Sequence, residues 1–212
     1  GSVNIICSDK TGTLTENKMT VVKSYTLGEL RDVPATTETL AAVGDEIQLI
    51  KSFVLCSDAT YENGQGTGDP TEIALVAWGG KYGLAKATLV SEQPRVNEKP
   101  FDSERKLMST LTRQGDAYRV HTKGALDQLL KIASHALVDG KLVPLTPVMK
   151  ESYLKVAEEM SDAALRVLGV AFRDTAQPID PAAMEQDLTI IGLVGMIDPP
   201  RLEVRDSIQT AK

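Results

Sequence analysis

Two apolar runs separated by a short turn constrain the fold of this chain more than any other feature. Residues 106–113 and 117–122 have the pattern of strands, and Gln114-Gly115-Asp116 between them is typical of a hairpin turn. A connection this short joins antiparallel strands, because parallel strands need a crossover of a dozen or more residues. The pattern therefore predicts an antiparallel sheet in the middle of the chain.

Helices are expected to pack on this sheet. Asp69 followed by Pro70 is typical of a helix start, because Asp caps the first turn and Pro is well tolerated in that turn. Apolar residues at helical spacing predict helices over the following ranges: 39–56 with a break near Gly44, 70–78, 125–136 and 150–164. Further strands are expected over 3–8, 19–26, 88–97, 166–173 and 188–196, and loops over 29–37 and 61–69.

The two ends of the chain differ from its middle. Each end has the pattern of a strand that runs into a loop, whereas the middle has enough strands and helices for a sheet of its own. This indicates an insertion, in which a host sheet is interrupted after its first strand and resumed near the end. We expect residues 1–18 and 196–212 to belong to the host domain and residues 19–195 to the inserted one.

Composition excludes several classes of protein. With 42% hydrophobic and 25% charged residues, the chain is expected to be a soluble globular protein. Its start without Met and its abrupt Ala211-Lys212 end suggest a fragment of a larger protein. The net charge of −6, with no run of like charges, gives no footprint for nucleic acid. Cys7 and Cys56 suggest a reducing compartment, and the two histidines, His121 and His135, are too far apart to predict a metal site.

The most informative short motif lies near the N-terminus. Asp9 follows the apolar run Ile5-Ile6-Cys7, at the expected carboxyl end of a strand, where open α/β sheets bind ligands. Thr11, Gly12 and Thr13 follow at once, and backbone N–H groups and hydroxyls of such a turn can hold phosphate oxygens. Lys10 adds positive charge. A carboxylate in this place can attack phosphorus and form an aspartyl-phosphate.

The string Asp9-Lys10-Thr11-Gly12-Thr13-Leu14-Thr15 resembles the phosphorylation signature of type II P-type cation-transporting ATPases. The resemblance implies that Asp9 accepts the γ-phosphoryl of ATP, that Asp9 and the Thr11 carbonyl bind Mg²⁺, and that Thr13 lies near the phosphate. This family shares the haloacid-dehalogenase fold, whose phosphatases usually carry an acid/base Asp where this chain has Thr11. Without that group, hydrolysis of the phospho-enzyme is expected to be slow.

Later segments resemble the nucleotide-binding motifs of the same family, in the same order. Gly68-Asp69-Pro70-Thr71-Glu72 resembles the motif that contacts adenine, and residues 99–109 resemble the segment whose Phe stacks on it. Thr122-Lys123-Gly124-Ala125 resembles the Lys-Gly-Ala motif, Leu165-Arg166-Val167-Leu168 the strand whose Arg reaches the phosphates, and Asp198-Pro199-Pro200-Arg201 the return hinge. The implied nucleotide-binding residues are Thr71, Glu72, Phe101, Met108, Lys123, Gly124, Arg166 and Asp198.

Two positions depart from the family pattern. Ser103 stands where several calcium pumps have an Arg that helps to hold the phosphates, and Leu126 stands where the family usually has Pro. Ser8, Asn17-Lys18-Met19 and residues 101–109 look most like the bacterial calcium-transporting branch. Two alternatives stay open: a free-standing phosphatase of the haloacid-dehalogenase type, and a non-catalytic nucleotide-binding module.

Taken as a resemblance, these motifs imply an α/β fold with a mostly antiparallel sheet flanked by helices. That domain would be inserted into partial Rossmann-like segments of the haloacid-dehalogenase type. Its partners would be ATP and the remaining domains and transmembrane helices of a pump, at the cytoplasmic face of a membrane. In the family, the other catalytic segments follow the return hinge. We therefore expect this chain to bind ATP with a dissociation constant of roughly 0.1 to several mM and not to turn it over. We also expect the chain to be monomeric.

Overall fold

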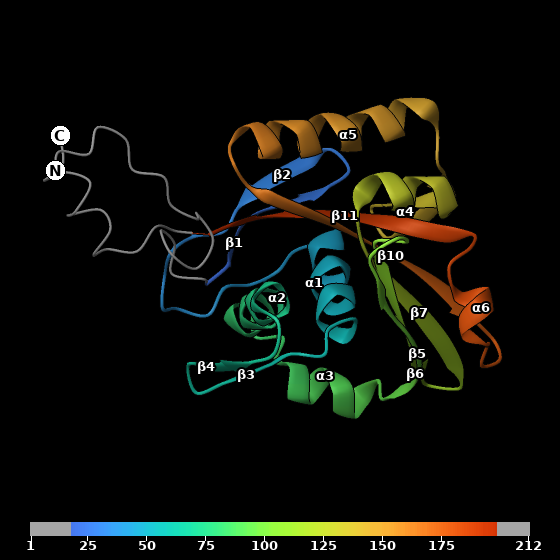
Figure 1. Cartoon of the computed structure of the whole chain (residues 1–212), viewed down its shortest axis with the longest axis horizontal. Helices are drawn as coiled ribbons and strands as arrows, with labels where there is room; N and C mark the ends of the chain where they lie inside the picture. Colours follow the sequence, from blue (N-terminus) through green and yellow to red (C-terminus); the bar gives the residue numbers. More distant parts are fainter. Residues whose placement is uncertain (1–17, 199–212) are drawn as a thin grey trace, which may run out of the picture.

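The computed structural model describes residues 18–198 (Figure 1). The helices are α1 Asp45–Leu55, α2 Pro70–Lys81, α3 Lys86–Glu92, α4 Leu126–Ile132, α5 Pro147–Asp162 and α6 Pro181–Met184. The strands are β1 Thr20–Thr26, β2 Glu29–Asp32, β3 Thr60–Glu62, β4 Gln65–Thr67, β5 Arg95–Asp102, β6 Leu107–Gln114, β7 Ala117–Gly124, β8 Ala133–Val138, β9 Lys141–Pro144, β10 Arg166–Thr175 and β11 Leu188–Ile197. The predicted strand over 3–8 lies outside the described residues.

Nine of these strands form one sheet in the described part of the chain. Its main path runs β2-β1-β11-β10-β7-β6-β5, and every neighbouring pair on that path is antiparallel. The strand β8 pairs with β11 in parallel and carries β9 at its outer edge. The predicted hairpin is confirmed, because β6 and β7 pair from Leu107↔Gly124 to Gln114↔Ala117.

Helices cover both faces of the sheet. Figure 1 shows α4 and α5 on one side of it and α1, α2 and α3 on the other. Neighbouring residues of β11 show why, since Ile191 packs with α1 and α2 whereas Ile190 packs with α4 and α5. Successive side chains of a strand point to opposite faces, so the apolar run in β11 serves two cores at once. This confirms the predicted α/β class with a mostly antiparallel sheet flanked by helices.

The helix α2 begins where the sequence predicts. The Asp69 carboxylate accepts hydrogen bonds from the backbone N–H groups of Thr71 and Glu72, and Pro70 occupies the first turn. Trp78 lies on the same helix, is buried, and packs edge-on against Phe53 of α1. Local capping chemistry therefore sets the start of α2, and apolar packing sets its orientation. None of the helices within residues 18–198 combines the length and apolar character needed to cross a bilayer.

Several sequence-based boundaries were wrong. Residues 29–37 and 61–69 were expected to be loops, but they contain β2 and the β3–β4 hairpin, whose turn Asn63-Gly64 has positive φ at both residues. Residues 88–97 were expected to form a strand, but α3 occupies the first part. The helix expected over 125–136 ends at Ile132, because the following residues pair with β11. The helix expected over 39–56 begins only after Gly44.

A buried histidine lies in the middle of the sheet. The His121 ring is fully enclosed, with Nδ1 3.0 Å from Ser52 Oγ and Nε2 3.1 Å from Thr112 Oγ1. Burial, assisted by the positive charges of Arg119 and Arg95, lowers the pKa of His121 to about 3. The ring is therefore neutral at physiological pH and acts as a polar cross-link between α1 and the sheet.

This histidine makes stability dependent on pH. The unfolded chain takes up the imidazole proton near pH 6.5 and the folded chain does not, so stability falls as the pH is lowered from 6.5 toward 3. Between pH 7.5 and 5, we expect His121 alone to cost about 2 kcal/mol of unfolding free energy. Urea unfolding of the wild type and of His121→Gln at both pH values measures this. An equal loss in the two proteins would contradict the assignment.

Candidate functional site

Three predicted residues form a row across neighbouring strands. Met108 of β6 pairs directly with Lys123 of β7. Phe101 lies in a bulge of β5, between the pairs Lys99↔Ser109 and Asp102↔Leu107, and therefore opposite Met108. Phe101 is 63% exposed, whereas Met108 and Lys123 are buried. The row thus has an exposed aromatic ring at one end and a buried ammonium group at the other.

The Lys123 ammonium joins three parts of the fold. Its Nζ lies 2.5 Å from the Cys56 carbonyl oxygen, 2.8 Å from Glu72 Oε2 and 3.1 Å from Met108 Sδ. A lysine has three N–H donors, and these contacts engage all of them. Lys123 therefore forms the floor of the site and fixes its neighbours.

Glu72 of α2 is held from two sides. Besides the ion pair with Lys123, both of its carboxylate oxygens lie 3.1 Å from the backbone N–H of Asp58. The Glu72 and Lys123 side chains are only 14% and 8% exposed, so water screens the attraction between their charges only weakly. This pair ties the start of α2 to the sheet.

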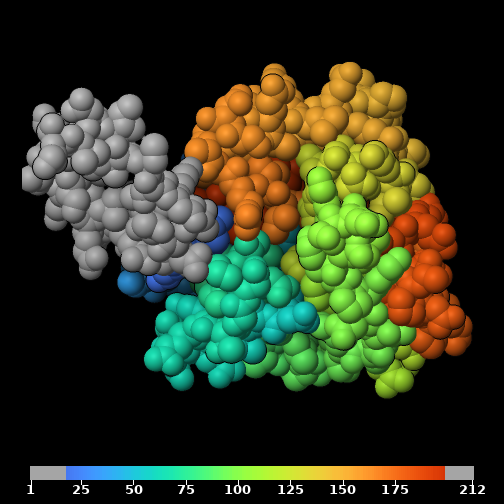
Figure 2. All heavy atoms as spheres, viewed as in Figure 1, coloured from blue at the N-terminus to red at the C-terminus, as the bar shows by residue number. Residues whose placement is uncertain are grey.

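Arg166 extends the site to the first turn of α2. Its Nη1 donates to the hydroxyl of Thr71 at 2.9 Å, which links the first residue of β10 to the first turn of α2. The predicted residues therefore form a continuous path, Phe101–Met108–Lys123–Glu72–Thr71–Arg166. In Figure 2, atoms of α2 (teal) and of the β5–β6 region (lime) lie on the same viewed face.

Gly124 was expected to let the backbone approach a nucleotide base, and the structure shows that it allows a close approach between two strands. Its φ of 152° is one that side chains disfavour, and a Cβ built there would lie 2.1 Å from the Lys106 carbonyl oxygen. The glycine therefore lets β7 approach the start of β6 very closely. Its approach to a nucleotide base stays a prediction.

Other predicted residues are not joined to this path. Asp198 lies just past β11, with Oδ1 buried and unpartnered among the described residues. The predicted catalytic and metal-binding residues Asp9, Lys10, Thr11 and Thr13 lie outside the described residues. Within residues 18–198 there is no group of three or more potential metal ligands.

Sequence reasoning missed several residues that build the site. The Cys56 carbonyl and the Asp58 N–H hold Lys123 and Glu72, and no sequence pattern marks backbone groups. The Cys56 thiol is itself enclosed, and burial raises its pKa, so it is an unreactive packing group. Arg105 and Glu185, which form an ion pair behind the row, were also missed.

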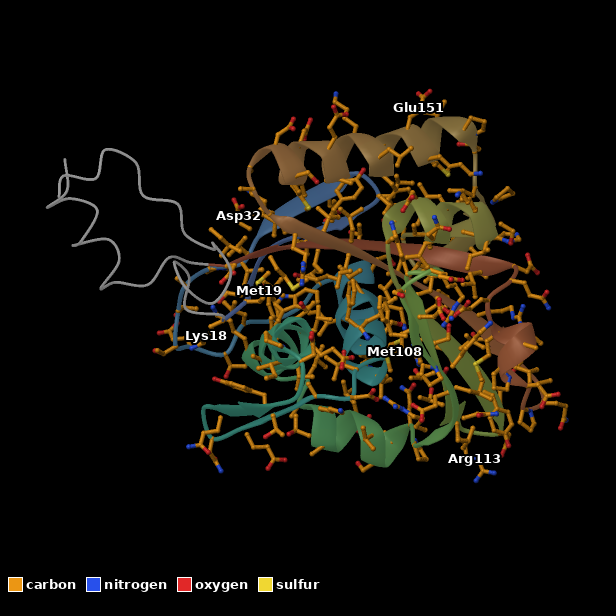
Figure 3. The ribbon with its side chains drawn as sticks, viewed as in Figure 1. Lys18, Met19, Asp32, Met108, Arg113 and Glu151 are labelled. Atoms are coloured by element: carbon orange, nitrogen blue, oxygen red, sulfur yellow. The ribbon has the colours of Figure 1, made fainter. Side chains whose placement is uncertain are left out.

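Predicted site residues line none of the principal cavities of the described fold. One of these cavities, of about 560 Å³, lies against α2, and the residues that line it include Met19, Tyr61, Ile73 and Trp78. Figure 3 shows Met19 and Met108 well apart, so this cavity and the row are separate places. The row is an open face rather than an enclosed cavity.

The site thus consists of an exposed aromatic ring and a buried Lys–Glu pair, on an open face of a sheet that has helices on both sides. Residues 46–203 match the family described as P-type ATPase, cytoplasmic domain N. The chain belongs to the P-type ATPases. This confirms the resemblance inferred from the motif at Asp9.

Relatives of known name agree with this assignment. The chain is 47% identical to calcium-transporting ATPase 1 of Bacillus cereus and 42% identical to that of Lactococcus lactis, in each case over the whole chain and 24% of the relative. It is 36% identical to cation-transporting ATPase pma1 of Synechocystis, over 96% of the chain and 25% of the relative. The chain thus spans about a quarter of the length of these relatives.

Proposed function

We propose that the chain is the ATP-binding part of a calcium-transporting pump. Membership of the P-type ATPases supports ATP as the nucleotide, and the names of the Bacillus and Lactococcus relatives support calcium as the ion. In this proposal the whole pump transfers the γ-phosphoryl of ATP to Asp9, with Mg²⁺ held by Asp9 and Thr11. This chain lies at the cytoplasmic face of a membrane, and its partners are the pump's other domains and membrane helices.

The observation that carries the proposal is the position of Phe101. A large aromatic side chain that is 63% exposed contributes little to a core, yet this one stands at a strand bulge beside buried Met108 and Lys123. An exposed ring beside the apolar Met108 side chain is suited to stacking on a planar base. We therefore place adenine on Phe101, with Met108 beneath it.

The direction of the path supports a proposed position for the phosphates. From Phe101 the path runs through Lys123 and Glu72 to Arg166, whose guanidinium binds Thr71 through one Nη. A guanidinium has five N–H donors, so donors remain for phosphate oxygens. The triphosphate is therefore proposed to extend toward Arg166 and the end of β11.

The chain by itself is proposed to bind ATP weakly, with a dissociation constant of roughly 0.1 to several mM, and without turnover. Ser103 stands where several calcium pumps have an Arg that helps to hold the phosphates, so one charge-assisted contact is absent. Incubation with labelled ATP and Mg²⁺ followed by acid quench tests the second part. A hydroxylamine-labile adduct on Asp9 would contradict it.

Phe101→Ala is expected to weaken ATP, ADP and AMP binding by about tenfold or more. Loss of base stacking costs roughly 1–3 kcal/mol per base, and all three nucleotides share the adenine. Calorimetric or NMR titration of the three nucleotides measures the change.

Tyr61→Ala is the matched control, because Tyr61 is also an exposed aromatic residue but lines the cavity against α2. We expect this variant to bind like the wild type. If Tyr61→Ala weakens binding and Phe101→Ala does not, the nucleotide lies in that cavity and the proposed site is wrong.

A further inference from the structure

The face of the sheet behind the Phe101 row carries a compact polar cluster. It consists of Glu185, Arg105, Lys99, Ser109 and Thr122. Glu185 follows α6 and is 7% exposed at its side chain. A carboxylate so nearly enclosed needs compensating partners. Its direct partners are Lys99 of β5, Arg105 of the β5–β6 turn and Ser109 of β6.

Arg105 joins Glu185 to the turn that carries Phe101. Its Nε lies 2.6 Å from Glu185 Oε2, as an ion pair whose N–H direction misses the carboxylate. Its Nη2 donates to the carbonyls of Pro100 and Leu107, at 2.8 and 2.9 Å. The guanidinium therefore spans the turn and closes it at both ends. Lys99 adds a second positive charge, 3.7 Å from the same carboxylate oxygen.

Ser109 joins Glu185 to the next two strands. The Ser109 hydroxyl donates to Glu185 Oε1 at 2.9 Å and lies 2.7 Å from the hydroxyl of Thr122. Ser109 and Thr122 are both fully buried. They immediately adjoin Met108 and Lys123 in the sequence, so their side chains occupy the opposite face of the same strand positions.

One carboxylate thus contacts β5, the β5–β6 turn and β6 from behind the row, and Ser109 links it to Thr122 of β7. We propose that Glu185 is a positioning residue for the nucleotide site, which holds Phe101 in the orientation that receives adenine by fixing the 100–107 turn through Arg105. This rests on the proposed function, because it assumes that adenine stacks on Phe101. Glu185 does not touch the nucleotide, and it acts through the backbone of the turn.

The test is a double-variant cycle by NMR titration with ATP on the whole chain. Glu185→Gln keeps the shape of the side chain and removes its charge. We expect it to weaken ATP binding roughly three- to tenfold in the wild type and to have little effect in the Phe101→Ala background. Glu151→Gln removes the same charge from an exposed site on α5, far from the row in Figure 3, and is expected to leave binding unchanged.

A readout without ligand separates positioning from loss of the fold. The chain has three phenylalanines, and Phe53 and Phe172 are buried while Phe101 is exposed. With fluorinated phenylalanine, Glu185→Gln should shift the ¹⁹F resonance of Phe101 and leave the other two in place. Arg105→Gln should give the same pattern, and it serves as the second variant if Glu185→Gln does not fold.

The outcomes are distinct. An equal loss of affinity in both backgrounds, or no loss in the wild type, overturns the positioning role while leaving adenine on Phe101. Movement of all three ¹⁹F resonances would also overturn it, because that indicates general loosening. If Phe101→Ala itself leaves ATP binding unchanged, the proposed function fails and the role of Glu185 falls with it.

Discussion

Gly192→Ala is expected to lower the free energy of unfolding by about 3 kcal/mol or more. Gly192 lies in β11, paired with Thr26 of β1 on one side and Val170 of β10 on the other. A Cβ built at this position would lie 1.9 Å from the Tyr25 carbonyl oxygen. Backbone cannot move aside as a side chain can, so β1 and β11 would have to separate.

Gly80→Ala provides the matched control for this prediction. Gly80 lies in α2, and a Cβ built there meets no atom within 4 Å. Alanine is a better helix former than glycine, so Gly80→Ala should raise the free energy of unfolding by about 0.5–1 kcal/mol. Urea unfolding compares the two variants. A Gly192→Ala protein as stable as the wild type would show that the β1–β11 contact is looser than described.

Lys123→Met is expected to lower the free energy of unfolding by about 2–3 kcal/mol and to abolish measurable ATP binding. Methionine keeps the length of the side chain but removes the ammonium that binds the Cys56 carbonyl and Glu72. Glu72 would then be a nearly enclosed carboxylate with only the Asp58 N–H as partner. The loss of unfolding free energy comes from leaving the Glu72 charge without its partner. The partial exposure of Glu72 reduces this loss somewhat.

Two comparisons isolate the charge effect. In Lys123→Met/Glu72→Gln the leftover charge is gone, so the double variant should be more stable than Lys123→Met alone. Lys23→Met breaks an ion pair with Asp32, whose side chain is 80% exposed, and should cost only about 0–1 kcal/mol. Equal losses for the Lys123 and Lys23 variants in urea unfolding would mean that the buried pair has no special role.

The features of the fold that the sequence predicts correctly depend on residues close together in the chain. The start of α2 follows from Asp69 and Pro70, and the β6–β7 hairpin follows from its turn, because both depend on residues that are neighbours in the chain. The boundary between α4 and β8 could not be found in this way. Residues from Ala133 onward leave the helix to pair with β11, a strand some fifty residues later, and this tertiary pairing overrides helical periodicity.

The site, too, contains residues that local motifs predict and residues that only the assembled fold reveals. Motifs predicted Glu72, Phe101 and Lys123, and the structure brings Glu72 and Lys123 into an ion pair across 51 positions of sequence. Nothing in those motifs points to Glu185, which meets Ser109 across 76 positions. The side chain that touches a ligand is often marked by a local motif, whereas the residue that supports it from behind is recognised only once the strands are assembled.

The most direct test of the central claim, that adenine lies on Phe101 beside Met108, is an NMR titration of methyl-labelled methionine with ATP. The chain has six methionines, of which Met108 lies in the row and Met19 lines the large cavity against α2 (Figure 3). We predict that the Met108 methyl resonance shifts and shows contacts to adenine protons, while the Met19 resonance stays in place. A shift of Met19 with none at Met108 would contradict the account and place the nucleotide in the cavity.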